Sequence, residues 1–199
     1  MKAGRPPHAL LAGALVALLT AGSGGGSAFA ADRARGAELA AGCAGCHGEN
    51  GNSETPATPS LAGHPAPYLT IQLILFREEQ RRHEVMTPIA KGLTDDDIEN
   101  LAAHYADQKR VRVEPSPAPA STGRSVSEAH RCGVCHLPDF SGREQIPRLS
   151  AQREDYLAKA MRDYKAGERS GVDGMMTGIL RPIADEDLVA LSTYLAGLP

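Results

Sequence analysis

Two short stretches decide the fold: Cys43-Ala44-Gly45-Cys46-His47 reads CAGCH, and Cys132-Gly133-Val134-Cys135-His136 reads CGVCH. Two cysteines separated by two residues can form two thioether bonds to one haem. The histidine that follows them is then held against the ring as an axial ligand of the iron. Because the motif occurs twice, the sequence predicts two covalently bound haem c groups, on Cys43 and Cys46 and on Cys132 and Cys135, with His47 and His136 as iron ligands.

Two other uses of Cys-x-x-Cys fit less well. A zinc ribbon places its two pairs about 15–20 residues apart, whereas Cys132 lies far beyond Cys46. A thioredoxin-like dithiol is expected beside a βαβ pattern, which the sequence lacks. Neither alternative explains why a histidine follows both pairs.

The motif belongs to a longer repeat, because further short segments recur in the same order. They are Pro59-Ser60-Leu61 with Pro147-Arg148-Leu149, Tyr68-Leu69 with Tyr156-Leu157, Met86-Thr87 with Met176-Thr177, and Asp95-Asp96-Asp97-Ile98 with Asp185-Glu186-Asp187-Leu188. Residues 113–122 read VEPSPAPAST, a composition typical of an extended linker. We therefore expect one domain over residues 31–112, a linker over 113–122 and a second domain over 123–199.

The secondary structure is predicted to be all-α. A short helix over Arg33 to Ala41 leads into the first motif, and Pro67 suits the start of a second helix. Thr94 is a good N-cap, and the acidic residues after it suit the positive end of a helix dipole. Apolar stripes follow at helical spacing, Ile98, Leu101 and Tyr105 in the first half and Leu188, Leu191 and Leu195 in the second.

The first 30 residues resemble a secretory signal. Lys2 and Arg5 precede an apolar run over residues 9–21, and Ala28-Phe29-Ala30 suits cleavage before Ala31. The alternative is a membrane anchor, but such a run is short for a span of about 20 residues. We expect residues 1–30 to be removed and the remainder to be exported.

Composition limits the possible functions. The formal net charge of −3 gives no reason to expect a nucleic-acid partner. With 5 Tyr, 3 Phe and no Trp, two small cores have few large side chains, so a bulky apolar prosthetic group would help to fill them.

The second axial ligand of each iron is predicted to be methionine, because Met86 and Met176 precede their acidic helix starts by equal spacing. Met175 is the rival of Met176, although it aligns with the apolar Val85. Met161 aligns with Leu73 and is expected in the core. A core role for Met86 is the alternative to ligation.

The ordered series of haem motif, Pro-x-Leu, Tyr-Leu, methionine and acidic helix start, present twice, resembles the dihaem cytochromes c of the c4 type. The resemblance covers Asp32 to Pro199. It implies two tandem class I cytochrome c folds, each around one haem, and a periplasmic electron carrier rather than an enzyme. Implied partners are redox proteins, namely an oxidase, cytochrome bc1 or a dehydrogenase, with peripheral association at the membrane.

The resemblance also implies that the carbonyl groups of Pro59 and Pro147 accept hydrogen bonds from the haem histidines; the alternative is an ordinary loop proline. Other expectations concern residues at the edge of the motifs. Arg81 and Arg169 are candidates to pair with haem propionates or to lie in solvent, and Tyr68 and Tyr156 to pack on haem or helix. His64 and His104 are expected not to bind iron, and His83 and His130 to be exposed.

The sequence therefore favours an electron shuttle between respiratory donors and a terminal acceptor such as an oxidase. The alternatives are a cytochrome subunit of a periplasmic dehydrogenase and a dihaem peroxidase-type enzyme. The peroxidase-type enzyme needs an iron with an open ligand position, which the paired methionines disfavour.

Overall fold

The structure is a computed structural model that describes residues 1–2, 4, 31–112, 114–116, 120–172 and 174–199. Most of the expected signal segment, residues 1–30, lies outside the described residues, as does part of the expected linker. Residues Ala31 to Pro199 form one compact unit. Within the described part of the chain, no helix is long and apolar enough to cross a membrane.

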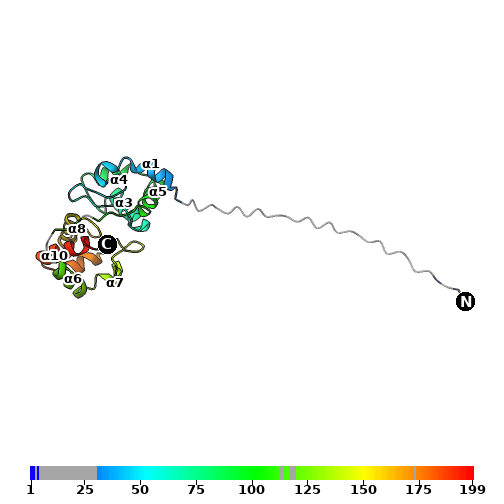
Figure 1. Cartoon of the computed structure of the whole chain (residues 1–199). Helices are drawn as coiled ribbons and strands as arrows, with labels where there is room; N and C mark the ends of the chain where they lie inside the picture. Colours follow the sequence, from blue (N-terminus) through cyan, green and yellow to red (C-terminus); the bar gives the residue numbers. More distant parts are fainter. Residues whose placement is uncertain (3, 5–30, 113, 117–119, 173) are drawn as a thin grey trace. The chain divides into compact units, whose positions relative to one another are not determined.

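Among the described residues, five helices in the first half are matched by five in the second. Figure 1 labels most of these helices along the chain. The first set is α1 (Arg33–Ala40), α2 (Ala44–His47), α3 (Ala66–Arg77), α4 (Met86–Lys91) and α5 (Asp95–Ala106). The second set is α6 (Ala120–Ala129), α7 (Gly133–His136), α8 (Glu154–Ala166), α9 (Met175–Leu180) and α10 (Asp185–Ala196). The only β-pairing among the described residues is an isolated bridge between Arg143 and Ile146. The all-α prediction is therefore confirmed.

Helix starts follow the local sequence. Thr94 caps α5 through a capping box, in which its hydroxyl accepts from the Asp97 amide and the Asp97 carboxylate accepts from the Thr94 amide. Pro67 lies one residue inside α3, where its missing N–H costs nothing. The described helices thus start close to the expected positions.

In each half the first and last helices cross closely at a glycine. A Cβ added to Gly36 of α1 would lie 2.1 Å from the Asn100 carbonyl oxygen of α5, and one added to Gly123 of α6 would lie 2.1 Å from the Ala190 carbonyl oxygen of α10. Only glycine permits so close an approach. This repeated pair was missed at the sequence level, because a lone glycine inside a helix gives no sign of what it packs against.

Each half has its own apolar core. In the first half Tyr68, Leu69, Leu101, Ala102 and Tyr105 are buried together with Ala40. The core of the second half contains Phe140, Leu157, Met161, Leu180, Ile183, Leu188, Leu191, Leu195 and Ala196. The predicted stripes on α5 and α10 are therefore buried, and Met161 is a core residue as expected.

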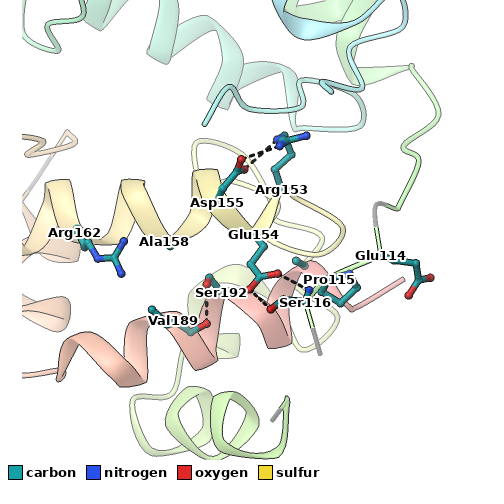
Figure 2. A pocket seen from close by; sticks show the side chains of 11 residues that line it. Glu114, Pro115, Ser116, Arg153, Glu154, Asp155, Ala158, Arg162, Val189 and Ser192 are labelled. Atoms are coloured by element: carbon teal, nitrogen blue, oxygen red, sulfur yellow. Dashed lines mark hydrogen bonds and ion pairs between the residues drawn. The ribbon is translucent and has the colours of Figure 1, made fainter. Parts of the chain in front are cut away.

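The link between the halves is partly helical and partly fixed to the second half. Helix α6 begins at Ala120, so residues 120–122, expected in the extended linker, are helical. The Glu154 carboxylate accepts from the Ser116 amide and hydroxyl, each at 2.7 Å, and from the Thr193 hydroxyl at 2.7 Å. Figure 2 shows Glu154 of α8 reaching Ser116 beside α10. The acidic side chain thereby attaches the linker to both helices.

The two halves meet through reciprocal contacts of aligned residues. Arg169 in the second half donates to the Tyr68 hydroxyl at 3.4 Å, and Arg81 in the first half donates to the Tyr156 hydroxyl at 3.3 Å. When one residue contacts another and their counterparts make the same contact, the two surfaces are related by an approximate twofold axis. The two sequence repeats therefore form two similar structural units that pack against each other.

Candidate functional site

The two motif histidines are held in the same way. Helix α2 ends on His47 and α7 ends on His136, and both side chains are buried, with 6% and 5% of their surface exposed. The His47 Nδ1 lies 2.9 Å from the Pro59 carbonyl oxygen, and the His136 Nδ1 lies 2.9 Å from that of Pro147. A carbonyl oxygen only accepts, so Nδ1 carries the proton and Nε2 keeps its lone pair for a metal.

Burial also favours the neutral imidazole. It lowers the pKa of His47 and of His136 below the ordinary value, against a smaller raising effect of each proline carbonyl. A neutral imidazole with a free Nε2 is the form that binds iron. Both imidazoles are therefore in a form suited to bind a metal through Nε2.

A cavity of about 580 Å³ adjoins His47. Cys43, Cys46, His47, Pro59 and Met86 all line it. Much of its wall is apolar, formed by Leu39, Leu61, Leu69, Leu73, Phe76, Ile89, Leu93, Leu101 and Ala102. The structure thus brings the predicted cysteines, histidine, proline and methionine of the first half to one apolar chamber, which a flat, largely apolar ring would fit.

The rim of this cavity carries buried donors that lack partners. Among the described residues, neither the His64 Nδ1 nor the Arg169 Nε forms a hydrogen bond, although both atoms are buried. Arg81 and Arg169 both contact Gln72, at 2.6 and 3.0 Å, and neither forms an ion pair with a carboxylate in the described part of the chain. Buried cations need anionic or hydrogen-bonding partners, which the propionates of a haem would supply.

The electrostatics of the rim agree. Burial acts to raise the pKa of Tyr156, but the charges of Arg169 and Arg81 outweigh it and lower that pKa below its ordinary value. Two guanidinium groups therefore act on one phenol at the rim. The chamber and its rim together fit a haem, with its apolar faces inside and its acidic groups at Arg81 and Arg169.

Met86 opens α4, and His83 fixes this start. The His83 Nδ1 accepts from the amides of Val85 and Met86, at 3.2 and 3.4 Å, while its own amide donates to the Thr87 hydroxyl at 3.0 Å. His83 is exposed as expected, but it also positions the turn that presents Met86. This role could not be predicted from the sequence, because a histidine cap has no fixed spacing.

The second half distinguishes its two adjacent methionines. Met175 is 54% exposed, whereas Met176 is partly buried and packs against the apolar core of the second half. This arrangement favours Met176 as the ligand of the second iron. His130 is exposed, and His104 packs edge-on against Tyr105.

A buried serine supports the first motif and was missed at the sequence level. The Ser53 hydroxyl donates to the Cys46 carbonyl at 2.8 Å and is buried with only 1% of its side chain exposed. It satisfies a carbonyl at the end of the short motif helix. Serine is common in loops, so no pattern marked this one.

A helical fold that carries Cys-x-x-Cys-His twice, each time with a buried histidine fixed by a proline carbonyl, defines the class of tandem class I c-type cytochromes. Comparison with known proteins agrees, since the family model for cytochrome c matches residues 33–106. Cytochrome c4 of Thiocapsa roseopersicina is 35% identical over 151 residues, which cover 70% of this chain and 78% of that protein.

Two further similarities extend the comparison. The crystal structure of reduced recombinant cytochrome c4 from Pseudomonas stutzeri matches with a TM-score of 0.80 at 32% identity, covering 85% of this chain and 100% of that one. A thiosulfate dehydrogenase electron acceptor of Thiomonas intermedia is 31% identical over 156 residues, which cover 71% of this chain and 70% of that protein. The chain belongs to the cytochrome c4 family of electron-transfer proteins, and as a cytochrome c it binds haem c covalently.

Proposed function

We propose that the chain is a periplasmic electron carrier with two haem c groups, one on Cys43 and Cys46 and one on Cys132 and Cys135. The axial ligands are His47 and Met86 in the first half and His136 and Met176 in the second. Residues 31–112 and 123–199 are the two haem domains. The signal over residues 1–30 directs export and is removed.

One observation carries this proposal: the histidine site is built twice with the same geometry. Both Nδ1–carbonyl distances are 2.9 Å, although the residue after the proline is Ser60 in one half and Arg148 in the other. A single such contact is compatible with an ordinary buried histidine. Two, each directly after Cys-x-x-Cys, are best explained by two iron sites.

The side chains then have separate tasks. Haem, when bound, supplies a one-electron iron couple. The four cysteines hold it, and the proline carbonyls keep each imidazole in one tautomer and one orientation. Soft methionine sulfur favours the reduced iron and so raises the potential. Arg81 and Arg169 hold the acidic groups at the contact between the halves, and the apolar walls exclude water.

With both axial positions taken by the protein, no position is left for a substrate, so we propose that the chain is not an enzyme. Its partners are redox proteins, either an oxidase and cytochrome bc1 or a dehydrogenase. The similarity to a thiosulfate dehydrogenase electron acceptor specifically favours a dehydrogenase donor as the second candidate function.

The test is an intact mass of protein isolated from the periplasm, together with a haem-stained gel. We expect the mass of the chain from Ala31 or Asp32 plus two haem groups, with no free thiol. A mass with one haem, or with zinc, contradicts the proposal. Stoichiometric binding of carbon monoxide by one ferrous haem would instead favour a peroxidase-type enzyme.

The two carrier functions can be separated by rapid-mixing kinetics with purified partners. Fast reduction by a thiosulfate dehydrogenase, with slow reduction by cytochrome bc1, supports the dehydrogenase donor. The opposite order supports the respiratory shuttle.

A further inference from the structure

Gln152 of the second half forms a two-point contact with the backbone of Ser60 in the first half. Its side-chain oxygen accepts from the Ser60 amide at 2.8 Å, and its side-chain nitrogen donates to the Ser60 carbonyl at 2.8 Å. Gln152 is buried, with 3% of its side chain exposed, and Ser60 is buried with 2% exposed. The contact is therefore sheltered from water, where hydrogen bonds are electrostatically stronger.

The orientation of the Gln152 amide follows from its partners. An N–H needs an acceptor and a C=O needs a donor, so the oxygen must face the Ser60 amide and the nitrogen the Ser60 carbonyl. The same oxygen also accepts from the Arg153 amide at 2.9 Å. The second hydrogen of the Gln152 nitrogen points to His64 Nε2 at 3.1 Å, so His64 is neutral and accepts there.

The Ser60 amide and the Pro59 carbonyl belong to one peptide group. Pro59 C=O accepts from His47 Nδ1 at 2.9 Å, while Ser60 N–H donates to Gln152 at 2.8 Å. Hydrogen bonds on the two ends of a peptide group polarise one another. We propose that Gln152 is a positioning residue that tunes the first iron site from the second half, through the Pro59–Ser60 peptide and His47.

The direction of the effect follows from the polarity. When the Ser60 N–H donates a hydrogen bond to Gln152, more negative charge remains on the Pro59 carbonyl oxygen. That oxygen then draws the Nδ1 proton of His47 more strongly, which makes the imidazole a better electron donor. A stronger donor stabilises oxidised iron, so Gln152 lowers the potential of the first haem. This inference rests on the proposed function, since it needs an iron on His47.

The relay is one-sided because the aligned residues differ. Gln152 aligns with His64, and Ser60 aligns with Arg148. The Arg148 guanidinium extends into the first half and donates to the Ala62 carbonyl at 2.9 Å. The two iron sites thus receive different influences from the opposite half, although their own ligands are equivalent.

The test replaces Gln152 by methionine, which has a similar shape but cannot accept from Ser60. In the ferrous, haem-loaded protein we expect the Nδ1–H resonance of His47 to move upfield while that of His136 stays. One potential should rise and the other should not. Loss of a group in direct contact with a metal ligand costs about 10–100-fold in metal affinity or activity. Gln152 acts from one hydrogen bond further away, so we expect about a threefold change in the redox equilibrium, or about 30 mV.

Ser150→Ala is the matched control. It removes another side-chain contact between the halves, the part-buried bond of 3.1 Å from the Arg110 guanidinium to the Ser150 hydroxyl, but does not touch the Pro59–Ser60 peptide. We expect neither histidine resonance to move. If Ser150→Ala shifts the same potential as Gln152→Met, loosening of the contact explains both, and the relay is wrong.

A third variant provides the test if the Gln152→Met protein does not fold. Gln152→Asn keeps the amide chemistry but is shorter by one methylene, so it should weaken the Ser60 contact and move the His47 resonance in the same direction. An unchanged His47 resonance in a folded variant overturns the inference. If such a variant still carries two haems with methionine-ligated spectra, the carrier function stands even though the relay fails.

Discussion

The two halves have equivalent histidine sites, at which we propose the two irons, and different contact surfaces. Their motif helices and histidine–proline bonds correspond residue for residue, with both bonds at 2.9 Å. At the contact, Gln152 bonds to Ser60 and His64, and Arg148 donates to the Ala62 carbonyl. Ser60 aligns with Arg148, and His64 aligns with Gln152. Identical ligands alone would give two similar potentials. The residues that differ between the halves lie at the contact between them. They can therefore give the two sites different potentials without a change of ligand.

The largest test of the comparison removes one haem at a time. Cys43→Ala with Cys46→Ala, and separately Cys132→Ala with Cys135→Ala, should each give a mass short by one haem and loss of helicity and protease resistance in the affected half. Each half buries few aromatic residues, and without a haem the first half is left with the cavity of about 580 Å³ beside His47, which is destabilising. A native-like helical apo-half in either variant would show that the polypeptide core is sufficient.

The next test compares the methionines. Met86→His and Met176→His should each lower one potential by a sizeable part of the ~0.8 V over which axial ligands act. Each should also abolish the sulfur-to-iron charge-transfer band of that haem. Met175→Ala is the matched control, because this side chain is 54% exposed and should leave both bands intact. If Met175→Ala instead removes a band, Met175 is the ligand.

A smaller effect is expected from the buried arginine of the contact. Arg148 is 1% exposed and donates to the carbonyls of Ala62 and Ser150. Arg148→Met leaves both without this donor, at about 1–3 kcal/mol each. Part of this loss is offset because burial of a guanidinium group is itself unfavourable. Burial is the largest cause that lowers the pKa of Arg148 to about 10.

We expect a net loss of about 2 kcal/mol in the free energy of unfolding, measured by urea titration of the haem-loaded protein. Arg110→Met is the control, since Arg110 is partly exposed and contributes one bond to Ser150; its cost should be below about 1 kcal/mol. An Arg148→Met protein as stable as the wild type would mean that the charge is as costly as its bonds are favourable.

A pH test separates His64 from its counterpart Gln152. Burial is the largest cause that lowers the pKa of His64 well below its ordinary value, followed by the charge of Arg148, with Arg169 acting in the same direction and the Ser60 backbone against them. Tyr68 stacks on the ring with centroids 4.9 Å apart, and Gln152 faces Nε2. The folded protein therefore holds His64 neutral.

The unfolded chain binds the proton first, so the contribution of His64 is complete above about pH 6.5 and declines as the pH falls below it. The slope is at most about 1.4 kcal/mol per pH unit. In the His64→Gln variant this slope should be absent, so the free energy of unfolding of the wild type minus that of the variant should fall as the pH falls below about 6.5 in urea titrations at several pH values. An unchanged slope would mean that His64 is protonated in the folded state.

The sequence alone was sufficient to predict the features that recur along it. The motifs, the stripes on α5 and α10 and the capping residue Thr94 each depend on local spacing, and the structure has them where they were expected. The contact between the halves could not be predicted, because Gln152 and Ser60 lie 92 positions apart and no periodic pattern joins them. The same holds for the bond from Ser53 to Cys46 and for the glycine crossings, which depend on tertiary approach.

The smallest expected effect comes from a difference in helix capping between the halves. Thr94 caps α5 with a capping box, whereas the corresponding residue before α10 is Ala184, which makes no side-chain bond. Yet the backbone is ready, since Ala184 has φ −65° and ψ 152°, close to the −76° and 169° of Thr94, and Asp187 stands where Asp97 stands. Ala184→Thr should therefore complete a second capping box.

A cap of this kind contributes about 0.5–2 kcal/mol, and we expect the lower end for Ala184→Thr, because α10 is already held by packing on α6 and α8. Thr94→Ala is the reverse change in the other half and should cost about 1 kcal/mol. The free energy of unfolding, measured for both variants and for the double variant, tests the comparison directly. If the halves are equivalent in this respect, the double variant should return close to the wild-type value; a large residual would show that capping acts differently where the chain leads into α5 and into α10.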